Sequence, residues 1–167
     1  MMIEKNKLYV IDEDTQTSIN QIKKKFPITE KRSAIIESLL LLQQNNNGHV
    51  TREMMKSLAN YLKVNEIDIY EVVTFYSMFN IKPVGKNVIS VCTNVSCMLK
   101  GSHKILNYLE NKLEIQVGDS TKDNKFFLKD EVECLAACSG APMMQVNHKN
   151  CENLTIEKVD QILEELS

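Results

Sequence analysis

Apolar positions recur at helical spacing in the first half of the chain. Between Lys31 and Gln44 they return every three or four residues, and the segment ends at residues 45–48, Asn-Asn-Asn-Gly, which tolerate the left-handed conformation that closes a helix. The same spacing returns from Arg52 to Lys63, and Thr51 stands before it as a suitable N-cap. Both segments are therefore predicted to be amphipathic helices.

The next segment, residues 67–76, is less clear. Its β-branched and aromatic residues would also suit a strand. Asn65 is a good N-cap and Asp68 follows three residues later, so we predict a helix. Residues 1–15 have no periodicity and are expected to form a loose arm.

The pattern changes at residues 82–86, Lys-Pro-Val-Gly-Lys, where Pro stops a helix and Gly permits a turn. Beyond this linker, short apolar runs predict strands at 87–92, 114–117, 126–129 and 143–147. Helices are expected at 102–112, with Ser102 as N-cap, and after Thr155 to the end of the chain. This order predicts a small mixed sheet covered by helices, and hence an α/β chain with a helical segment at 1–84 and a second domain at 85–167.

Composition excludes several classes of protein. The 167 residues are 43% hydrophobic and 25% charged, with only 5 Gly and 3 Pro, which argues against fibrous and wholly disordered chains. A net charge of −2 offers no broad cationic surface for nucleic acid or anionic lipid. No apolar run approaches the length of a membrane span and no signal-peptide pattern follows Met1, so direct membrane insertion is not expected. A protein interface is the expected contact.

The chain contains 5 Cys, an odd number, without the secreted context of a disulfide framework. Cys92 and Cys97 form a C-x4-C pair, and Cys134 and Cys138 form a C-x3-C pair. The wider C-x4-C spacing is typical of two-iron ferredoxin loops, whereas zinc sites favour C-x2-C knuckles. Spacing alone favours an iron–sulfur cluster and leaves zinc, or buried or redox thiols, as alternatives. Cys151 has no partner at such a spacing and is interpreted as a free thiol.

The surroundings of the two loops are small and apolar. Such residues let backbone N–H groups approach sulfur and keep water away, and both effects tune a cluster. Met143 and Met144 are interpreted as core residues. The three histidines stand in no cysteine–histidine pair, and no Gly-rich phosphate loop is present, so the chain is not expected to bind NADH or FMN itself.

The loops also match a known family. Residues 92–102, CTNVSCMLKGS, and 131–144, EVECLAACSGAPMM, resemble the thioredoxin-like 2Fe-2S subunit of NADH:quinone oxidoreductase, which is the E subunit in bacteria and flavoprotein 2 in mitochondrial complex I. The resemblance extends upstream through residues 31–36, 70–79 and 82–85. It therefore covers nearly the whole chain beyond about residue 20.

The resemblance implies a thioredoxin-like ferredoxin domain carrying one 2Fe-2S cluster. It assigns Cys92 and Cys97 to one iron and Cys134 and Cys138 to the other, with no catalytic acid, base or nucleophile on this chain. This sequence departs from the family at residue 37, Glu where Pro is frequent, and at Ala136, where Gly is common. Neither change removes a ligand.

The resemblance also implies partners and a location. The helical segment is expected to pack against the FMN- and NADH-binding subunit, with an iron–sulfur subunit as a further neighbour. The chain would exchange electrons with the FMN as a peripheral subunit on the cytoplasmic side of the bacterial inner membrane, or on the matrix side if organellar. The alternatives are the equivalent subunit of an NAD-linked formate dehydrogenase or hydrogenase, and a zinc- or thiol-stabilised adaptor.

Overall fold

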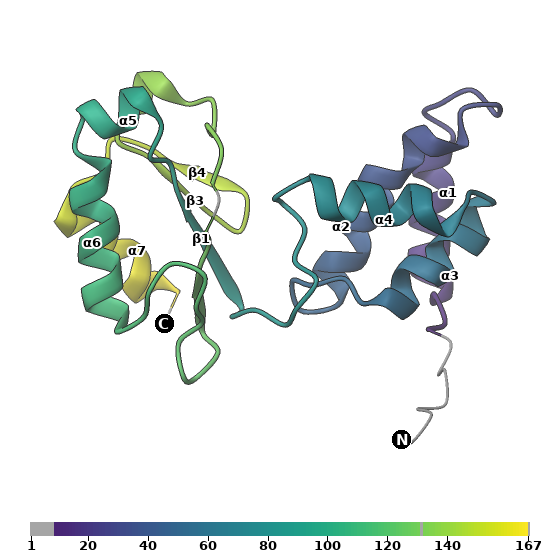
Figure 1. Cartoon of the computed structure of the whole chain (residues 1–167), viewed down its shortest axis with the longest axis horizontal. Helices are drawn as coiled ribbons and strands as arrows, with labels where there is room; N and C mark the ends of the chain where they lie inside the picture. Colours follow the sequence, from purple (N-terminus) through teal and green to yellow (C-terminus); the bar gives the residue numbers. More distant parts are fainter. Residues whose placement is uncertain (1–8, 131, 167) are drawn as a thin grey trace. The chain divides into compact units, whose positions relative to one another are not determined.

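The computed structural model describes residues 9–130 and 132–166. The chain divides into two compact units, Met1–Pro83 and Val84–Ser167 (Figure 1). In the described part no helix is long and apolar enough to cross a membrane.

Unit 1 is helical. Its elements are α1 (Glu13–Lys23), the 3-10 turn η1 (Lys31–Ala34), α2 (Ile35–Asn45), α3 (Arg52–Leu62) and α4 (Glu66–Phe75). All four helices contribute buried apolar side chains to one core. The hydroxyl of Thr51 caps α3 by accepting from the Met54 N–H at 3.2 Å, as the sequence predicts. The ambiguous segment is helical, and the Asn65 N–H donates to the Asp68 carboxylate at 3.2 Å.

Buried polar contacts hold the last turns of unit 1. The side chain of Gln43 is almost fully buried, and its Nε2 donates to the Met78 carbonyl at 3.0 Å. Its Oε1 accepts from the Asn80 N–H at 2.8 Å. One amide side chain on α2 therefore satisfies two backbone groups of the chain that follows α4.

Unit 2 contains a four-stranded mixed sheet. Its strands are β1 (Asn87–Val91), β2 (Phe126–Leu128), β3 (Met144–Val146) and β4 (Lys149–Cys151), in the spatial order β2-β1-β3-β4. Strand β1 pairs parallel with β2 and antiparallel with β3. The helices are the short α5 (Val95–Leu99), α6 (Ser102–Leu113) and α7 (Ile156–Glu165), with a 3-10 turn η2 (Cys138–Gly140).

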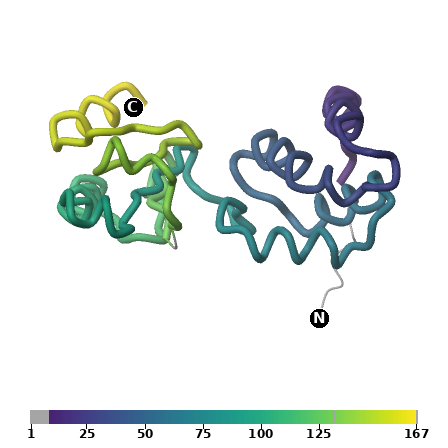
Figure 2. The backbone as a smooth tube through the Cα atoms, turned by 90° about the horizontal axis from the view of Figure 1, so that it is seen from above, coloured from purple at the N-terminus to yellow at the C-terminus, as the bar shows by residue number. Residues whose placement is uncertain are grey.

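Helices α6 and α7 lie side by side on one face of the sheet (Figures 1 and 2). The inward residues of β1, Ile89 and Val91, meet Leu109 of α6 and Val159 of α7 in one core. The Thr155 hydroxyl caps α7 by accepting from the Lys158 N–H at 3.2 Å, as expected. The predicted mixed α/β architecture is thus confirmed.

One prediction about unit 1, the loose arm at residues 1–15, needs correction. Residues 13–15, assigned to a loose arm, belong to α1, and residues 1–8 of that arm lie outside the described part. The Asp12 carboxylate caps α1 by accepting from the Thr15 N–H at 2.8 Å, and Ile19 is fully buried. Helix α1 has few apolar residues, so its cap and the contacts of Ile19 and Ile22 with the core replace the periodicity that the sequence lacks.

In unit 2 the predicted strand at 114–117 is wrong. Glu114 ends α6 in the left-handed conformation (φ 54°), and the chain turns at Gly118, whose N–H donates to the Leu128 carbonyl at 2.7 Å. The alternation at 114–117 comes from a helix end, where Ile115 packs on the core.

The strand β4 was not predicted because its residues are mostly polar. It pairs with β3 through a tight turn in which Asn147 and His148 both have positive φ, 50° and 64°. Cys151 ends this strand.

Gly85 has a role other than the turn expected of it. A Cβ at this position would lie within 2.8 Å of the Phe127 nitrogen and closer still to the Phe126 carbonyl. The Gly85 N–H donates to the Ser120 hydroxyl at 3.0 Å. Glycine is therefore required because the backbone of β2 passes in direct contact.

Candidate metal centre

The strand register brings the two cysteine loops to one end of the sheet. Val91, the last residue of β1, is paired with Met144 of β3. The pairing continues one step further, where the Cys92 N–H donates to the Met143 carbonyl at 3.2 Å. Since Met143 follows Cys138 by five residues, the first and second loops leave the sheet beside each other.

The first loop is folded around a short helix that the sequence did not predict. Asn94 is the N-cap of α5, and its side chain accepts from the Val95 N–H at 3.1 Å. The helix turns Cys97 inward, so that Cys92 and Cys97 are each only 2% exposed. Both pack with the buried side chain of Met143 in a small core of their own.

The second loop is more open. Cys134 and Cys138 are both exposed, while the neighbouring Leu135 and Ala137 are half-buried against the Cys92–Cys97 core. Ala136, between the two cysteines, has a positive φ of 57°. The left-handed conformation costs a residue with a Cβ more than it costs glycine, so this turn is strained by its alanine.

Gly140 ties the end of this loop to the chain beyond β4. Its carbonyl accepts from the Asn153 N–H at 2.6 Å. A Cβ on Gly140 would lie 2.5 Å from the Cβ of Glu152, so a larger residue here would push the two segments apart.

The four thiols are close enough to affect one another. Burial would raise the pKa of Cys92, but hydrogen bonds from the backbones of Leu135 and Asn94, and contacts with the Cys97 and Cys134 side chains, outweigh it and lower that pKa. Burial raises the pKa of Cys97, and the neighbouring charges of Cys92 and Cys138 raise it further. Cys92 thus interacts with Cys97 and Cys134, and Cys97 interacts with Cys138, whereas Cys151 lies apart at the end of β4.

Several groups around the thiols could not be identified from the sequence. The backbones of Leu135 and Met143 interact with Cys92 and Cys97, a role that no side-chain pattern signals. Met144 fills the main core of unit 2 as expected, but Met143 packs on the cysteines instead. Ser102 was predicted as the N-cap of α6, but the N-cap is Gly101 (φ 90°). Ser102 is instead the first residue of the helix, and its side chain is fully buried.

The fold and the paired cysteine loops define a ferredoxin-like electron-transfer domain. The model of the thioredoxin-like [2Fe-2S] ferredoxin family matches residues 19–167, and the chain belongs to this family. Among curated proteins it is 43% identical over 158 residues to the E subunit of NADH-quinone oxidoreductase from Rickettsia bellii, covering 95% of this chain and 94% of that protein. It is 38% identical over 154 residues to mitochondrial NADH dehydrogenase [ubiquinone] flavoprotein 2 of Dictyostelium discoideum, covering 92% and 62%. The resemblance seen in the sequence is thereby confirmed.

A solved structure supports the fold. The NAD+-reducing [NiFe]-hydrogenase in its air-oxidised state aligns with a TM-score of 0.64 at 20% identity. The alignment covers 77% of this chain and 22% of the hydrogenase chain. At this identity the likeness describes the architecture alone.

The donor set fits the cluster that the family carries. Within the described residues, no three His, Cys, Asp or Glu side chains converge closely enough to hold a single metal ion. A [2Fe-2S] cluster instead takes two ligands on each of two irons, so two cysteine pairs are the unit to compare. The two loops supply two such pairs of free thiols, together with backbone hydrogen bonds to sulfur and an apolar floor.

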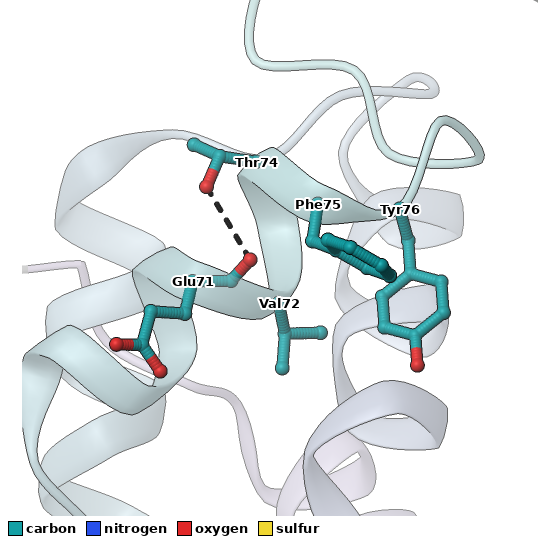
Figure 3. A pocket seen from close by; sticks show the side chains of 5 residues that line it. All are labelled: Glu71, Val72, Thr74, Phe75 and Tyr76. Atoms are coloured by element: carbon teal, nitrogen blue, oxygen red, sulfur yellow. Dashed lines mark hydrogen bonds between the residues drawn. The ribbon is translucent and has the colours of Figure 1, made fainter.

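A second surface of interest lies on α4. Its buried face uses Ile69 and Val73, yet its other face exposes large apolar side chains, including Tyr70 and Phe75, which is 78% exposed. Near the end of the helix an open hollow of about 560 Å³ is lined by Glu71, Val72, Thr74, Phe75 and Tyr76 (Figure 3). There the ring of Phe75 meets that of Tyr76 edge to face, with centroids 5.0 Å apart. A helix that is apolar on both faces is typical of a surface that another protein covers.

Proposed function

We propose that this chain is the [2Fe-2S] electron-transfer subunit of an NADH-quinone oxidoreductase. Cys92 and Cys97 would bind one iron, and Cys134 and Cys138 the other. When bound, such a cluster accepts and releases one electron at a time. The observation that carries the proposal is that the two cysteine loops leave the same end of the sheet beside each other, with Cys92 in contact with Cys97 and Cys134, in a chain of this family.

The protein contributes burial, hydrogen bonds and access. The core formed by Cys92, Cys97 and Met143 keeps water from the first pair of ligands. Backbone hydrogen bonds to these sulfurs stabilise negative charge on them, which favours the reduced state. The exposed Cys134 and Cys138 leave one edge of the centre open to an electron partner.

We further propose that the exposed face of α4 packs against the subunit that binds FMN and NADH, with an iron–sulfur subunit as a second neighbour. The support is the large apolar area of this face, which water solvates poorly, and the assembly named for the relatives. The complex would place the chain on the cytoplasmic side of a bacterial inner membrane, or on the matrix side in an organelle, as a peripheral subunit. Fractionation of cells, with and without salt washing of the membranes, tests this location.

The partner proposal is tested by purifying the complex through a tag on the flavin subunit. Phe75→Ser should reduce the amount of this chain that copurifies at least tenfold, because a central apolar anchor is lost. The matched control is Ile28→Ser, since Ile28 is 92% exposed in the same unit but lies outside α4. Equal recovery of both variants would contradict docking through α4.

The ligand assignment is tested by single Cys→Ser variants of the four cysteines. Each should lose or alter the cluster's EPR signal and visible absorption, whereas Cys151→Ser should keep both. Assays of the intact complex with quinone, formate and hydrogen as co-substrates distinguish the proposed enzyme from the related formate dehydrogenase or hydrogenase. A Cys97→Ser protein with an unchanged spectrum and unchanged NADH oxidation would favour a zinc- or thiol-stabilised adaptor instead.

A further inference from the structure

Ser102 is the first residue of α6, and its side chain is 0% exposed. Its hydroxyl has no hydrogen-bond partner within the described part of the chain. Burying a hydroxyl without a partner is costly, and alanine would form the first turn of a helix at least as well. A structural role for Ser102 in starting α6 therefore does not account for its hydroxyl.

The topology places Ser102 at the end of the sheet where the cysteines lie. Strands β1 and β2 are parallel, and α6 lies between them in the chain, so the start of α6 is at the end where β1 runs into Cys92. Helix α6 packs on β1, and α5, which carries Cys97, packs on α6. In Figure 1 the start of α6 and the helix α5 stand together at this end of unit 2.

The chemistry of this end of the sheet suggests an acceptor. Thiolate ligands and the sulfides of a cluster accept hydrogen bonds and cannot donate them, while a serine hydroxyl can donate one. The N-terminus of a helix of 12 residues also favours negative charge. The hydroxyl and the helix end therefore both favour an anionic sulfur-ligated centre.

We propose that Ser102 is a positioning and tuning residue whose hydroxyl, which has no cysteine sulfur as partner in the described structure, donates a hydrogen bond to an inorganic sulfide of the cluster. This inference rests on the proposed function. The hydrogen bond stabilises the reduced centre, which carries one more negative charge than the oxidised centre, and so raises the reduction potential. Ser102 ligates no iron and transfers no electron.

The test is an EPR-monitored redox titration of the full chain carrying its cluster. Ser102→Ala should keep the wild-type content of iron and sulfide while shifting the reduction equilibrium about fivefold toward the oxidised form. At 59 mV per tenfold for one electron, this is a fall of about 40 mV. The matched control is Ser38→Ala, because Ser38 is also 0% exposed with an unpartnered hydroxyl in the described structure, but lies in the core of unit 1. Its potential should equal that of the wild type.

A second pair of variants separates the hydroxyl from the packing. Ser102→Thr and Ser102→Val have nearly the same shape, but only threonine has a hydroxyl that can donate a hydrogen bond. The reduction potential of the Thr variant should therefore exceed that of the Val variant by about as much as wild type exceeds Ser102→Ala. Equal potentials for this pair, or a Ser102→Ala potential equal to wild type, would overturn the inference.

Failure of the Ala and Val variants to take up the cluster, with Thr loading normally at an unchanged visible spectrum, would support a hydrogen bond to the centre. If the Ala, Val and Thr variants all fail to take up the cluster, Ser102 acts through its packing and the proposed hydrogen bond is overturned. A wild-type chain that holds no [2Fe-2S] cluster would refute the proposed function itself.

Discussion

Ala136 gives a direct test of the geometry of the second cysteine loop. It is exposed and has a φ of 57°, so its methyl group adds strain without adding buried contacts. The left-handed conformation costs a non-glycine residue about 1–2 kcal/mol, and glycine costs about 0.4–1 kcal/mol through the entropy of the unfolded chain. Ala136→Gly should therefore stabilise unit 2 by about 0.5–1 kcal/mol.

The neighbouring alanine provides the matched control. Ala137 has a negative φ of −113° and is half-buried, so Ala137→Gly gains no relief from strain and should destabilise by about 1 kcal/mol. Calorimetry of the two variants with reduced cysteines should show melting temperatures displaced in opposite directions, by several degrees each. If Ala136→Gly lowers the melting temperature as Ala137→Gly does, the loop does not have the conformation described, and the placement of Cys134 and Cys138 would have to be revised.

Four further substitutions test the scaffold. Gly85→Ala should destabilise the protein by about 2–3 kcal/mol in thermal melts, because its Cβ meets the backbone of β2. Gly101→Ala should cost only about 1 kcal/mol, because φ is 90° but a Cβ there would meet only the Lys104 side chain, at 4.0 Å. Gln43→Leu should cost about 1–3 kcal/mol in urea denaturation, since it removes two hydrogen bonds to the part-buried Met78 carbonyl and Asn80 N–H, and a neutral result would contradict the bonds described. The Tyr108 hydroxyl donates a hydrogen bond to the Asp160 carboxylate at 2.6 Å, and this bond is the largest cause of the lowered pKa of Asp160. The bond therefore stabilises the fold above the ordinary carboxyl pKa, and this stabilisation is lost as the pH falls through the lowered pKa of Asp160. In Tyr108→Phe, stability should fall less steeply with decreasing pH below about pH 4 than in the wild type. Acid titration followed by circular dichroism measures this slope, and equal slopes for variant and wild type would contradict the expectation.

The sequence predicted those elements whose local signals agreed with their burial. Helix α3 has a hydroxyl cap, a sustained apolar face and a left-handed end at Lys63, and it was predicted almost to the residue. Helix α1 and strand β4 were missed because their residues are mostly polar: a capping carboxylate and a tight turn with positive φ define them instead. The strand expected at 114–117 shows the opposite error, since an apolar alternation arose there from the end of a helix.

The same distinction applies to the site. The four cysteines stood out in the sequence through their spacing and family resemblance. Their surroundings did not, because the approach of the Met143 backbone depends on the register between β1 and β3, which no local pattern specifies. The hydroxyl of Ser102 suggested a helix cap, and only the position of Gly101 and the burial of the side chain showed otherwise.

The most direct test of the account is the metal and sulfide content of the purified chain, together with its EPR spectrum after reduction. The purified chain should be brown, with two irons and two acid-labile sulfides per chain, and its reduced-state signal should be lost in Cys97→Ser. A colourless protein that holds one zinc and no sulfide would contradict it.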